Sequence, residues 1–180
     1  MRIGLDLDGV VVNSIPYWIR VLNREAGTNY GPGDLPSSHG TPAMASCSDR
    51  HELEMLIAAP PMPGAPEALC RLRAAGHTLV AITHRNTRLT AITRAWLDYW
   101  GLTVDQLHCV EGAAKAPVAH AERVDLFIED SPKNAIGLAE AGIPVLLFAA
   151  PYNREVAHPL IRHCEGWDGV LAEVESQAAD

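Results

Sequence analysis

The sequence has no long hydrophobic run, and this absence excludes a helix that crosses a membrane. Such a helix needs about 20 consecutive apolar residues, and no stretch of the chain approaches that length. The apolar run from Ile3 to Val12 is interrupted by Asp6 and Asp8, which the hydrophobic core of a signal peptide would not contain. We therefore expect a cytoplasmic protein without a membrane partner.

The sequence also lacks an excess of basic residues and lacks paired cysteines. It carries 14 Lys and Arg against 22 Asp and Glu, which gives a formal net charge of -8. Because no stretch is strongly basic, binding to a nucleic acid polymer is not expected. The 4 cysteines form no CxxC pair, so reduced and mostly buried thiols are expected. No set of ligands at the usual spacing indicates a zinc site.

What the sequence does contain is an alternation of short apolar runs and helical segments. With 180 residues, 48% of them hydrophobic, the chain is long enough for one domain with a core. Continuous apolar runs are typical of parallel strands covered on both faces, and the alternation predicts a three-layer, Rossmann-like α/β fold. The expected strands are Ile3–Leu7, Thr78–Ile82, Leu107–Val110, Asp125–Glu129 and Pro144–Phe148. The expected helices are Ala65–Ala75, Thr87–Trp100 and Pro132–Ala141, each followed by a glycine.

One interval breaks this rhythm, because about 70 residues separate the first expected strand from the second. Residues 13–26 and 49–58 are expected to form helices, and the segment between them is rich in Gly, Pro and Ser. An interval of this length predicts a small helical insertion. It leaves the sheet directly after Asp6 and Asp8, so we expect it to cover them as a cap. The predicted division is a core of residues 1–14 and 63–180 with a cap of residues 15–62.

Polar residues follow the expected strands at their carboxyl ends, where open parallel sheets bind ligands. The first strand ends in two carboxylates, the second is followed by a hydroxyl and two basic side chains, and the fourth ends in two further carboxylates. A lysine lies between the third and fourth strands, and the chain has only one other. These residues are Asp6, Asp8, Thr83, His84, Arg85, Lys115, Glu129 and Asp130.

Carboxylates that converge from separate strands repel one another unless a cation holds them, and hard oxygen ligands suit Mg²⁺. A metal ion and a lysine together can neutralise a phosphate and the charge that develops on it. The Asp6 carboxylate is a candidate nucleophile, and Asp8, two residues away, can donate and accept a proton. Gly9 can turn the chain and present backbone N–H groups to a phosphate.

Four motifs in this order resemble those of the haloacid dehalogenase superfamily. They are Asp6-Leu-Asp-Gly-Val10, Thr83 after an apolar strand, Lys115, and Ile128-Glu-Asp-Ser131. Each motif alone is a weak signal, but four in order on the expected elements are a strong one. The match covers roughly residues 1–14 and 64–150. It implies a phosphoryl-transfer enzyme, because the true dehalogenases lack the second aspartate that is present here as Asp8.

The resemblance also assigns roles to the acidic residues. It implies that Asp6 is the nucleophile and that Asp8 is the general acid and base. It implies Mg²⁺ on the side chains of Asp6 and Asp130 and on the backbone carbonyl of Asp8. Glu129 would act beside the metal through a water molecule.

For the phosphoryl group, the resemblance implies Thr83 and Lys115 as binding residues, with His84 as a further candidate. Arg85 either clamps a phosphate with two hydrogen bonds or pairs with a carboxylate. Tyr17 and Trp18 of the expected cap either stack on a base of the substrate or belong to the cap's own small core.

A closer resemblance is to the deoxyribonucleotidase-like branch, which includes cytosolic 5'(3')-deoxyribonucleotidases and bacterial relatives. It implies hydrolysis of a nucleoside monophosphate. The chain departs from the animal enzymes at the second motif, where theirs continues Thr-Ser-Pro and this one Thr-His-Arg. The residues that carry the resemblance are Thr83-His-Arg85, Trp100-Gly-Leu102, Lys115-Ala116, Asp125 to Ala135, and Pro151-Tyr-Asn153 with Trp167.

The sequence therefore predicts a Mg²⁺-dependent phosphomonoester hydrolase that works through an aspartyl-phosphate. The expected partner is a small phosphate ester, with a (deoxy)nucleoside 5'-monophosphate as the leading candidate. A phosphosugar or another small phosphorylated metabolite stays open as the substrate. A non-catalytic binding protein with the same fold also stays open, as does a homodimer.

Overall fold

The structure is a computed structural model, and it describes residues 1–31, 34 and 51–177. Its strands are β1 (Arg2–Leu5), β2 (Thr78–Thr83), β3 (Gln106–Cys109), β4 (Leu126–Glu129), β5 (Val145–Phe148) and β6 (Ile161–Cys164). They form one sheet in the order β3-β2-β1-β4-β5-β6, in which every neighbouring pair is parallel. The strand order reverses between β1 and β4, and ligands of open α/β sheets bind at such a switch point.

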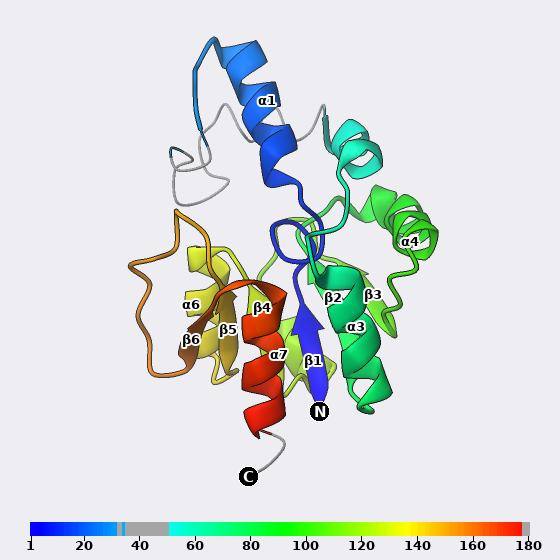
Figure 1. Cartoon of the computed structure of the whole chain (residues 1–180), viewed down its shortest axis with the longest axis vertical. Helices are drawn as coiled ribbons and strands as arrows, with labels where there is room; N and C mark the ends of the chain where they lie inside the picture. Colours follow the sequence, from blue (N-terminus) through cyan, green and yellow to red (C-terminus); the bar gives the residue numbers. More distant parts are fainter. Residues whose placement is uncertain (32–33, 35–50, 178–180) are drawn as a thin grey trace.

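Helices cover both faces of this sheet, as Figure 1 shows for the face nearer the viewer. One apolar cluster joins α3 (Ala65–Ala74), α4 (Thr90–Tyr99) and α7 (Gly166–Gln177) to one face. A second joins α5 (Ala116–Ala121) and α6 (Pro132–Glu140) to the other. Successive strand residues alternate between the two clusters, with Ile128 in the first and Phe127 in the second. The predicted three-layer α/β fold is confirmed.

A close contact at the centre of the sheet explains a glycine in β1. A Cβ atom on Gly4 would lie 2.3 Å from the Phe127 ring of the neighbouring strand. The glycine therefore makes room for a fully buried aromatic ring. The ammonium group of Lys115 lies 5.6 Å from the centre of the same ring, so this packing also supports a residue of the candidate site.

Some elements differ from the sequence-based expectation. The segment expected as one helix over residues 87–100 begins with a short 3-10 turn, η1 (Thr87–Leu89), before α4. The strand β6 and the helix α7 were not predicted. Arg162 and His163 of β6 are exposed, so this edge strand shows no continuous apolar run.

The long interval after β1 leaves the carboxyl edge of the sheet and contains α1 (Ile15–Ala26) and a helical segment at residues 51–58. The two helices pack through buried apolar side chains, among them Trp18 and Leu56. The two linkers to the core are hydrogen-bonded to each other, since the Met62 N–H donates to the Val11 carbonyl at 2.8 Å. Most of the Gly-, Pro- and Ser-rich segment lies outside the described residues.

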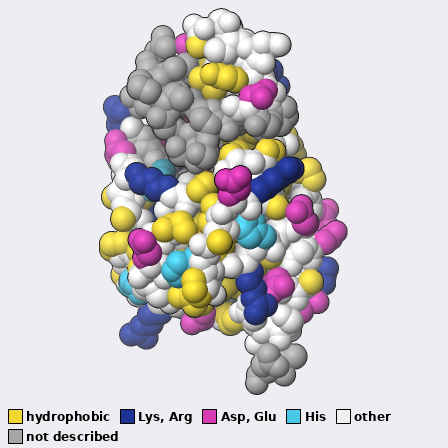
Figure 2. All heavy atoms as spheres, turned by 90° about the vertical axis from the view of Figure 1, so that its left-hand side faces the viewer, with side chains coloured by type: hydrophobic (Ala, Val, Ile, Leu, Met, Phe, Trp, Pro, Cys, Tyr) yellow, Lys and Arg dark blue, Asp and Glu magenta, His cyan; other side chains and the backbone are white. Residues whose placement is uncertain are grey.

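The surface of the core carries charges of both signs. Figure 2 shows one face on which basic, acidic and hydrophobic side chains of the described residues are interspersed. Within the described part of the chain, no helix combines the length and the apolar character that a membrane span requires.

Candidate active site

The loop after β1 forms a tight turn that carries the first two carboxylates. The Leu7 carbonyl accepts hydrogen bonds from the N–H groups of Val11 at 2.8 Å and Val12 at 2.7 Å. Gly9 lies at the centre of this turn with φ +88°, and a Cβ atom there would lie 2.1 Å from a carboxylate oxygen of Asp130. Only glycine lets the turn approach the next strand this closely. Trp167 supports the turn by donating to the Val10 carbonyl at 3.0 Å.

Asp6, Lys115 and Glu129 form a buried chain of ionic contacts. The Lys115 Nζ atom lies 2.9 Å from Asp6 Oδ1 and 2.6 Å from Glu129 Oε2. The other Glu129 oxygen, Oε1, accepts the backbone N–H groups of Asp130 at 3.1 Å and Ser131 at 3.0 Å. Both Glu129 oxygens therefore already have donors in the protein.

Asp130 is held by the loop after β5. The Tyr152 hydroxyl donates to Asp130 Oδ2. The Asn153 side-chain amide donates to the backbone carbonyl of Asp130 at 2.7 Å and to that of Phe148 at 2.9 Å. The remaining oxygen, Asp130 Oδ1, is buried and has no hydrogen-bond partner among the described residues. A buried polar atom without a partner is costly, and coordination of a cation would satisfy it.

Carboxylate oxygens of Asp6, Glu129 and Asp130 lie within 4.8 Å of one another, a spacing that could hold a metal ion. These ligands are hard oxygen donors, which suit Mg²⁺. The unpartnered Asp130 oxygen fits direct coordination of such an ion. Glu129, whose oxygens are occupied, fits an indirect contact through water.

The electrostatics of this cluster are unusual because all of its members are buried. Burial raises the pKa of Asp6 to about 6, and the negative charge of Glu129 adds to the shift while Lys115 opposes it. Burial likewise raises the pKa of Asp130 well above its ordinary value, with a further contribution from Glu129. Burial lowers the pKa of Lys115, but Asp6 and Glu129 outweigh it and raise that pKa above its usual range. The cluster favours a further positive charge, as a divalent cation would supply.

Asp8, the second carboxylate of the turn after β1, is paired with Arg85. The guanidinium donates from Nε to Asp8 Oδ2 at 2.8 Å and from Nη2 to Asp8 Oδ1 at 3.0 Å. Of the two functions considered for Arg85 from the sequence, the structure shows the pairing with a carboxylate.

Thr83 is the last residue of β2 and His84 follows it, at the same edge of the sheet. Thr83 is buried, and its hydroxyl oxygen accepts the Arg85 N–H at 3.4 Å. His84 is exposed, and its Nε2 atom lies 3.0 Å from the Ala113 carbonyl in the loop that precedes Lys115. The structure therefore brings Thr83 to the site and directs the His84 ring nitrogen toward that loop.

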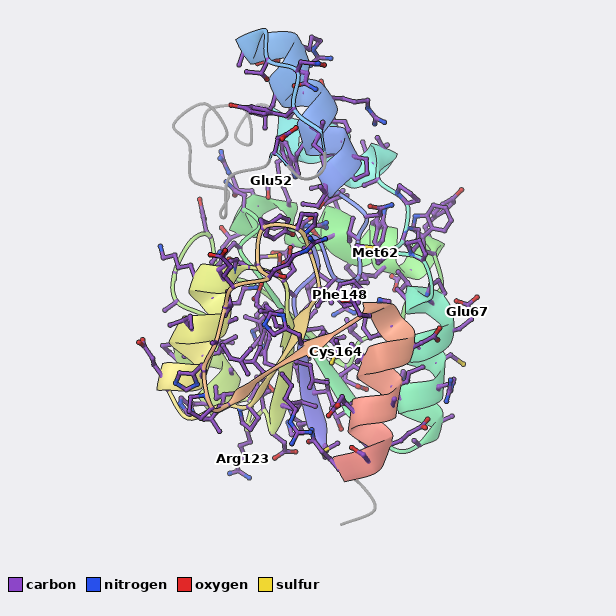
Figure 3. The ribbon with its side chains drawn as sticks, turned by 60° about the vertical axis from the view of Figure 1, so that its left-hand side comes forward. Glu52, Met62, Glu67, Arg123, Phe148 and Cys164 are labelled. Atoms are coloured by element: carbon purple, nitrogen blue, oxygen red, sulfur yellow. The ribbon has the colours of Figure 1, made fainter. Side chains whose placement is uncertain are left out.

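The cap aromatics Tyr17 and Trp18 make structural contacts with other residues of the protein. Trp18 is buried in the apolar cluster, and the Tyr17 hydroxyl donates to Glu54 at 2.9 Å. A cap residue that the sequence did not indicate reaches the core instead: Glu52, labelled in Figure 3, accepts the Asn86 N–H at 2.8 Å where the cap meets the core.

Two further site residues, Tyr152 and Asn153, were not assigned to the acidic cluster from the sequence. The signal that could have found them is their position in the loop that follows β5, because the carboxyl ends of parallel strands share one edge.

Comparison with known proteins identifies relatives. A family model described as "5' nucleotidase, deoxy (Pyrimidine), cytosolic type C protein" matches residues 1–174. YqfW of Bacillus subtilis (strain 168), a candidate nucleotidase by its name, is 32% identical over 165 residues, covering 86% of this chain and 83% of YqfW.

Solved structures share the fold at lower identity. A haloacid dehalogenase-like protein of unknown function from Agrobacterium tumefaciens str. C58 matches with a TM-score of 0.72 and 14% identity over 98% of both chains. D,D-heptose 1,7-bisphosphate phosphatase from B. bronchiseptica, complexed with magnesium and phosphate, matches with a TM-score of 0.61 and 18% identity, covering 98% of this chain and 99% of that one. Since the family model spans nearly the whole chain, this chain belongs to the cytosolic type C deoxy-(pyrimidine) 5'-nucleotidase family and is a phosphatase, with the fold of haloacid dehalogenase-like proteins.

Proposed function

We propose that the chain hydrolyses phosphate monoesters with Asp6 as the nucleophile, in a Mg²⁺-dependent reaction through an aspartyl-phosphate. The observation that carries this proposal is the arrangement of Asp6. It lies at the switch point of the sheet, 2.9 Å from the ammonium group of Lys115, and its carboxylate and that of Asp130 offer oxygens within 4.8 Å of each other. A carboxylate next to a fixed cation and a candidate metal site suits attack on a phosphorus atom.

In the first step, the Asp6 carboxylate attacks phosphorus in line, and the bond between phosphorus and the ester oxygen breaks. Asp8 donates a proton to the departing oxygen. Lys115 and Thr83 bind the phosphoryl oxygens. Mg²⁺, held by Asp6, Asp130 and the backbone carbonyl of Asp8, would neutralise charge on the phosphoryl group.

In the second step, a water molecule cleaves the aspartyl-phosphate. Asp8, now ionised, accepts a proton from the water as its oxygen bonds to phosphorus. The bond between phosphorus and the Asp6 oxygen breaks, inorganic phosphate leaves, and the Asp6 carboxylate is restored. Both steps use the same two carboxylates in the turn after β1.

For the substrate, we propose (deoxy)nucleoside 5'-monophosphates. Support comes from the family description and from the nucleotidase name of the Bacillus subtilis relative. Support for magnesium comes from the heptose bisphosphate phosphatase complex. A phosphosugar or another small phosphorylated metabolite is the alternative, because the cap determines which leaving group fits.

The test combines one variant with a substrate panel. Asp6→Asn keeps the size of the side chain but removes the nucleophile, so kcat should fall by about 10⁴-fold or more while the thermal unfolding temperature stays close to wild type. EDTA should abolish wild-type turnover, and added Mg²⁺ should restore it. Asp98→Asn on the exposed face of α4 is the matched control and should be fully active.

The panel should contain nucleoside monophosphates, deoxynucleoside monophosphates and sugar phosphates. Preference for the nucleotides supports the substrate proposal, and preference for a sugar phosphate overturns it. Full turnover by Asp6→Asn would overturn the mechanism whichever substrate is preferred.

A further inference from the structure

The pair of Arg85 and Asp8 is nearly withdrawn from solvent. The Arg85 side chain is 2% exposed and the Asp8 side chain is 16% exposed. The third guanidinium nitrogen, Nη1, lies 3.5 Å from the hydroxyl oxygen of Thr93 on α4. Each of the three nitrogens of the guanidinium group thus has a partner within the protein, and two of them share one carboxylate.

Such an arrangement fixes the orientation of the carboxylate. Two parallel hydrogen bonds from a planar guanidinium define both the position and the plane of the Asp8 carboxylate. Burying the charge of Arg85 costs free energy of folding. We expect this cost to be offset by a functional benefit, the fixed geometry of the Asp8 carboxylate. A general acid must lie within about 2.6–3.2 Å of the oxygen to which it donates. The position of the Asp8 carboxylate therefore determines whether Asp8 can donate a proton to the leaving-group oxygen.

The turn that carries Arg85 is itself held by the cap. Glu52 of the helical segment 51–58 accepts the backbone N–H of Asn86, the next residue along the chain, at 2.8 Å. Burial lowers the pKa of Arg85, but the charges of Asp8, Asp6 and Glu52 together raise it above its ordinary value. Glu52 therefore supports Arg85 by holding the backbone of the turn that carries it.

We propose that Arg85 is a positioning residue that orients the Asp8 carboxylate for proton transfer with the leaving-group oxygen, and that the cap residue Glu52 supports it by holding the turn at residues 84–86. This inference rests on the proposed function, because it takes Asp8 to be the general acid. It gives Arg85 a function other than direct binding of the substrate phosphate.

The test uses two substrates that differ in their need for an acid. The 4-nitrophenolate group of 4-nitrophenyl phosphate leaves as a stable anion, whereas the alkoxide of an alkyl phosphate must be protonated. Arg85→Met should lower kcat/KM for the best alkyl ester of the panel by about 10²-fold, and for 4-nitrophenyl phosphate by less than about 3-fold. Arg71→Met, at an exposed arginine of α3, should change neither value.

Conservative variants separate positioning from folding. Arg85→Lys keeps the charge but not the two-pronged geometry, so its loss on the alkyl ester should lie between those of the wild type and Arg85→Met. Glu52→Gln keeps an acceptor for the Asn86 N–H and should be close to wild type. Glu52→Ala should show the same selective loss as Arg85→Met, but a smaller one. Equal losses on both substrates in folded Arg85→Lys and Arg85→Met would overturn the proposal.

Asp8→Asn distinguishes failure of this inference from failure of the proposed function. If Asp8→Asn lowers kcat/KM selectively for the alkyl ester and Arg85→Met does not, Asp8 is the acid of the first step but Arg85 does not position it. If Asp8→Asn loses neither activity, the assignment of Asp8 as the acid is wrong, and the inference about Arg85 fails with it.

Discussion

Two clusters of acidic side chains, one in the core and one in the cap, contain similar groups in different surroundings. In the core, Glu129 is 0% exposed and contacts the ammonium group of Lys115. In the cap, the Glu54 side chain is 62% exposed and contacts His51 and Tyr17. The comparison shows that burial, rather than the kind of side chain, separates a candidate reaction centre from a structural contact.

The direction of the pKa shifts shows the same contrast. Hydrogen bonds from His51 and Tyr17 lower the pKa of Glu54, so its ionised form is stabilised where it is. Burial raises the pKa of Asp6 to about 6 and that of Asp130 well above its ordinary value, despite the lysine nearby. The core cluster therefore holds negative charge that its own cation does not fully compensate, which a bound cation would relieve.

Removing the buried cation should have the largest effect. Lys115→Met leaves Asp6 and Glu129 buried without their partner, so the free energy of unfolding in the absence of Mg²⁺ should fall by about 3–5 kcal/mol. Urea denaturation measures this change. The control is Arg162→Met, because Arg162 lies 2.9 Å from Glu173 but its side chain is 68% exposed; its cost should be below about 1 kcal/mol. Equal costs for the two variants would show that burial does not distinguish them.

Removing a supporting hydroxyl should have an intermediate effect. Tyr152→Phe deletes the hydrogen bond to Asp130, so the dissociation constant for Mg²⁺ should rise by about 10-fold. Calorimetric titration of the protein with Mg²⁺ measures it, and the rise in unfolding temperature with Mg²⁺ gives a second readout. Tyr17→Phe deletes the equivalent contact in the cap and should leave Mg²⁺ binding unchanged. Unaltered Mg²⁺ affinity in Tyr152→Phe would refute a supporting role for the hydroxyl.

The smallest effect concerns pH and the cap. Hydrogen bonds to Glu54 and Glu25 raise the pKa of His51 above 6.5, whereas burial and then the charge of the chain N-terminus lower that of His77 below 6.5. Because the His51 shift is upward, its contribution to stability is present below pH 6.5 and is lost as pH rises through its folded pKa. NMR titration should find the two histidines on opposite sides of 6.5. If His51 and His77 titrated at the same pH, the contacts of His51 with Glu54 and Glu25 would be contradicted.

The sequence predicts the central sheet well because buried parallel strands have a distinctive pattern. The runs that became β1, β2, β4 and β5 are almost entirely apolar, and the side chains at their carboxyl ends converge as expected. The edge strand β6 escaped detection because its central residues, Arg162 and His163, face solvent. Periodicity identifies strands by what they bury, so a half-exposed strand gives a weak signal.

The candidate site divides in the same way. Asp6, Lys115 and Asp130 could be assigned because their position at a strand end or between strands fixes the edge on which they lie. The contacts of Arg85, Tyr152 and Glu52 could not, because each depends on side-chain geometry between segments distant in sequence. An arginine after a strand has the same sequence signal whether it binds a phosphate or a carboxylate.

The central claim, that Asp6 carries the phosphoryl group during the reaction, is tested most directly by trapping the intermediate. Borohydride reduces an acyl phosphate to an alcohol, so adding it during turnover should convert Asp6 to homoserine, and mass spectrometry of the peptide containing Asp6 would detect this. The account predicts modification of Asp6 only when substrate and Mg²⁺ are both present. Modification of a different residue, or steady turnover with Asp6 unchanged, would contradict it.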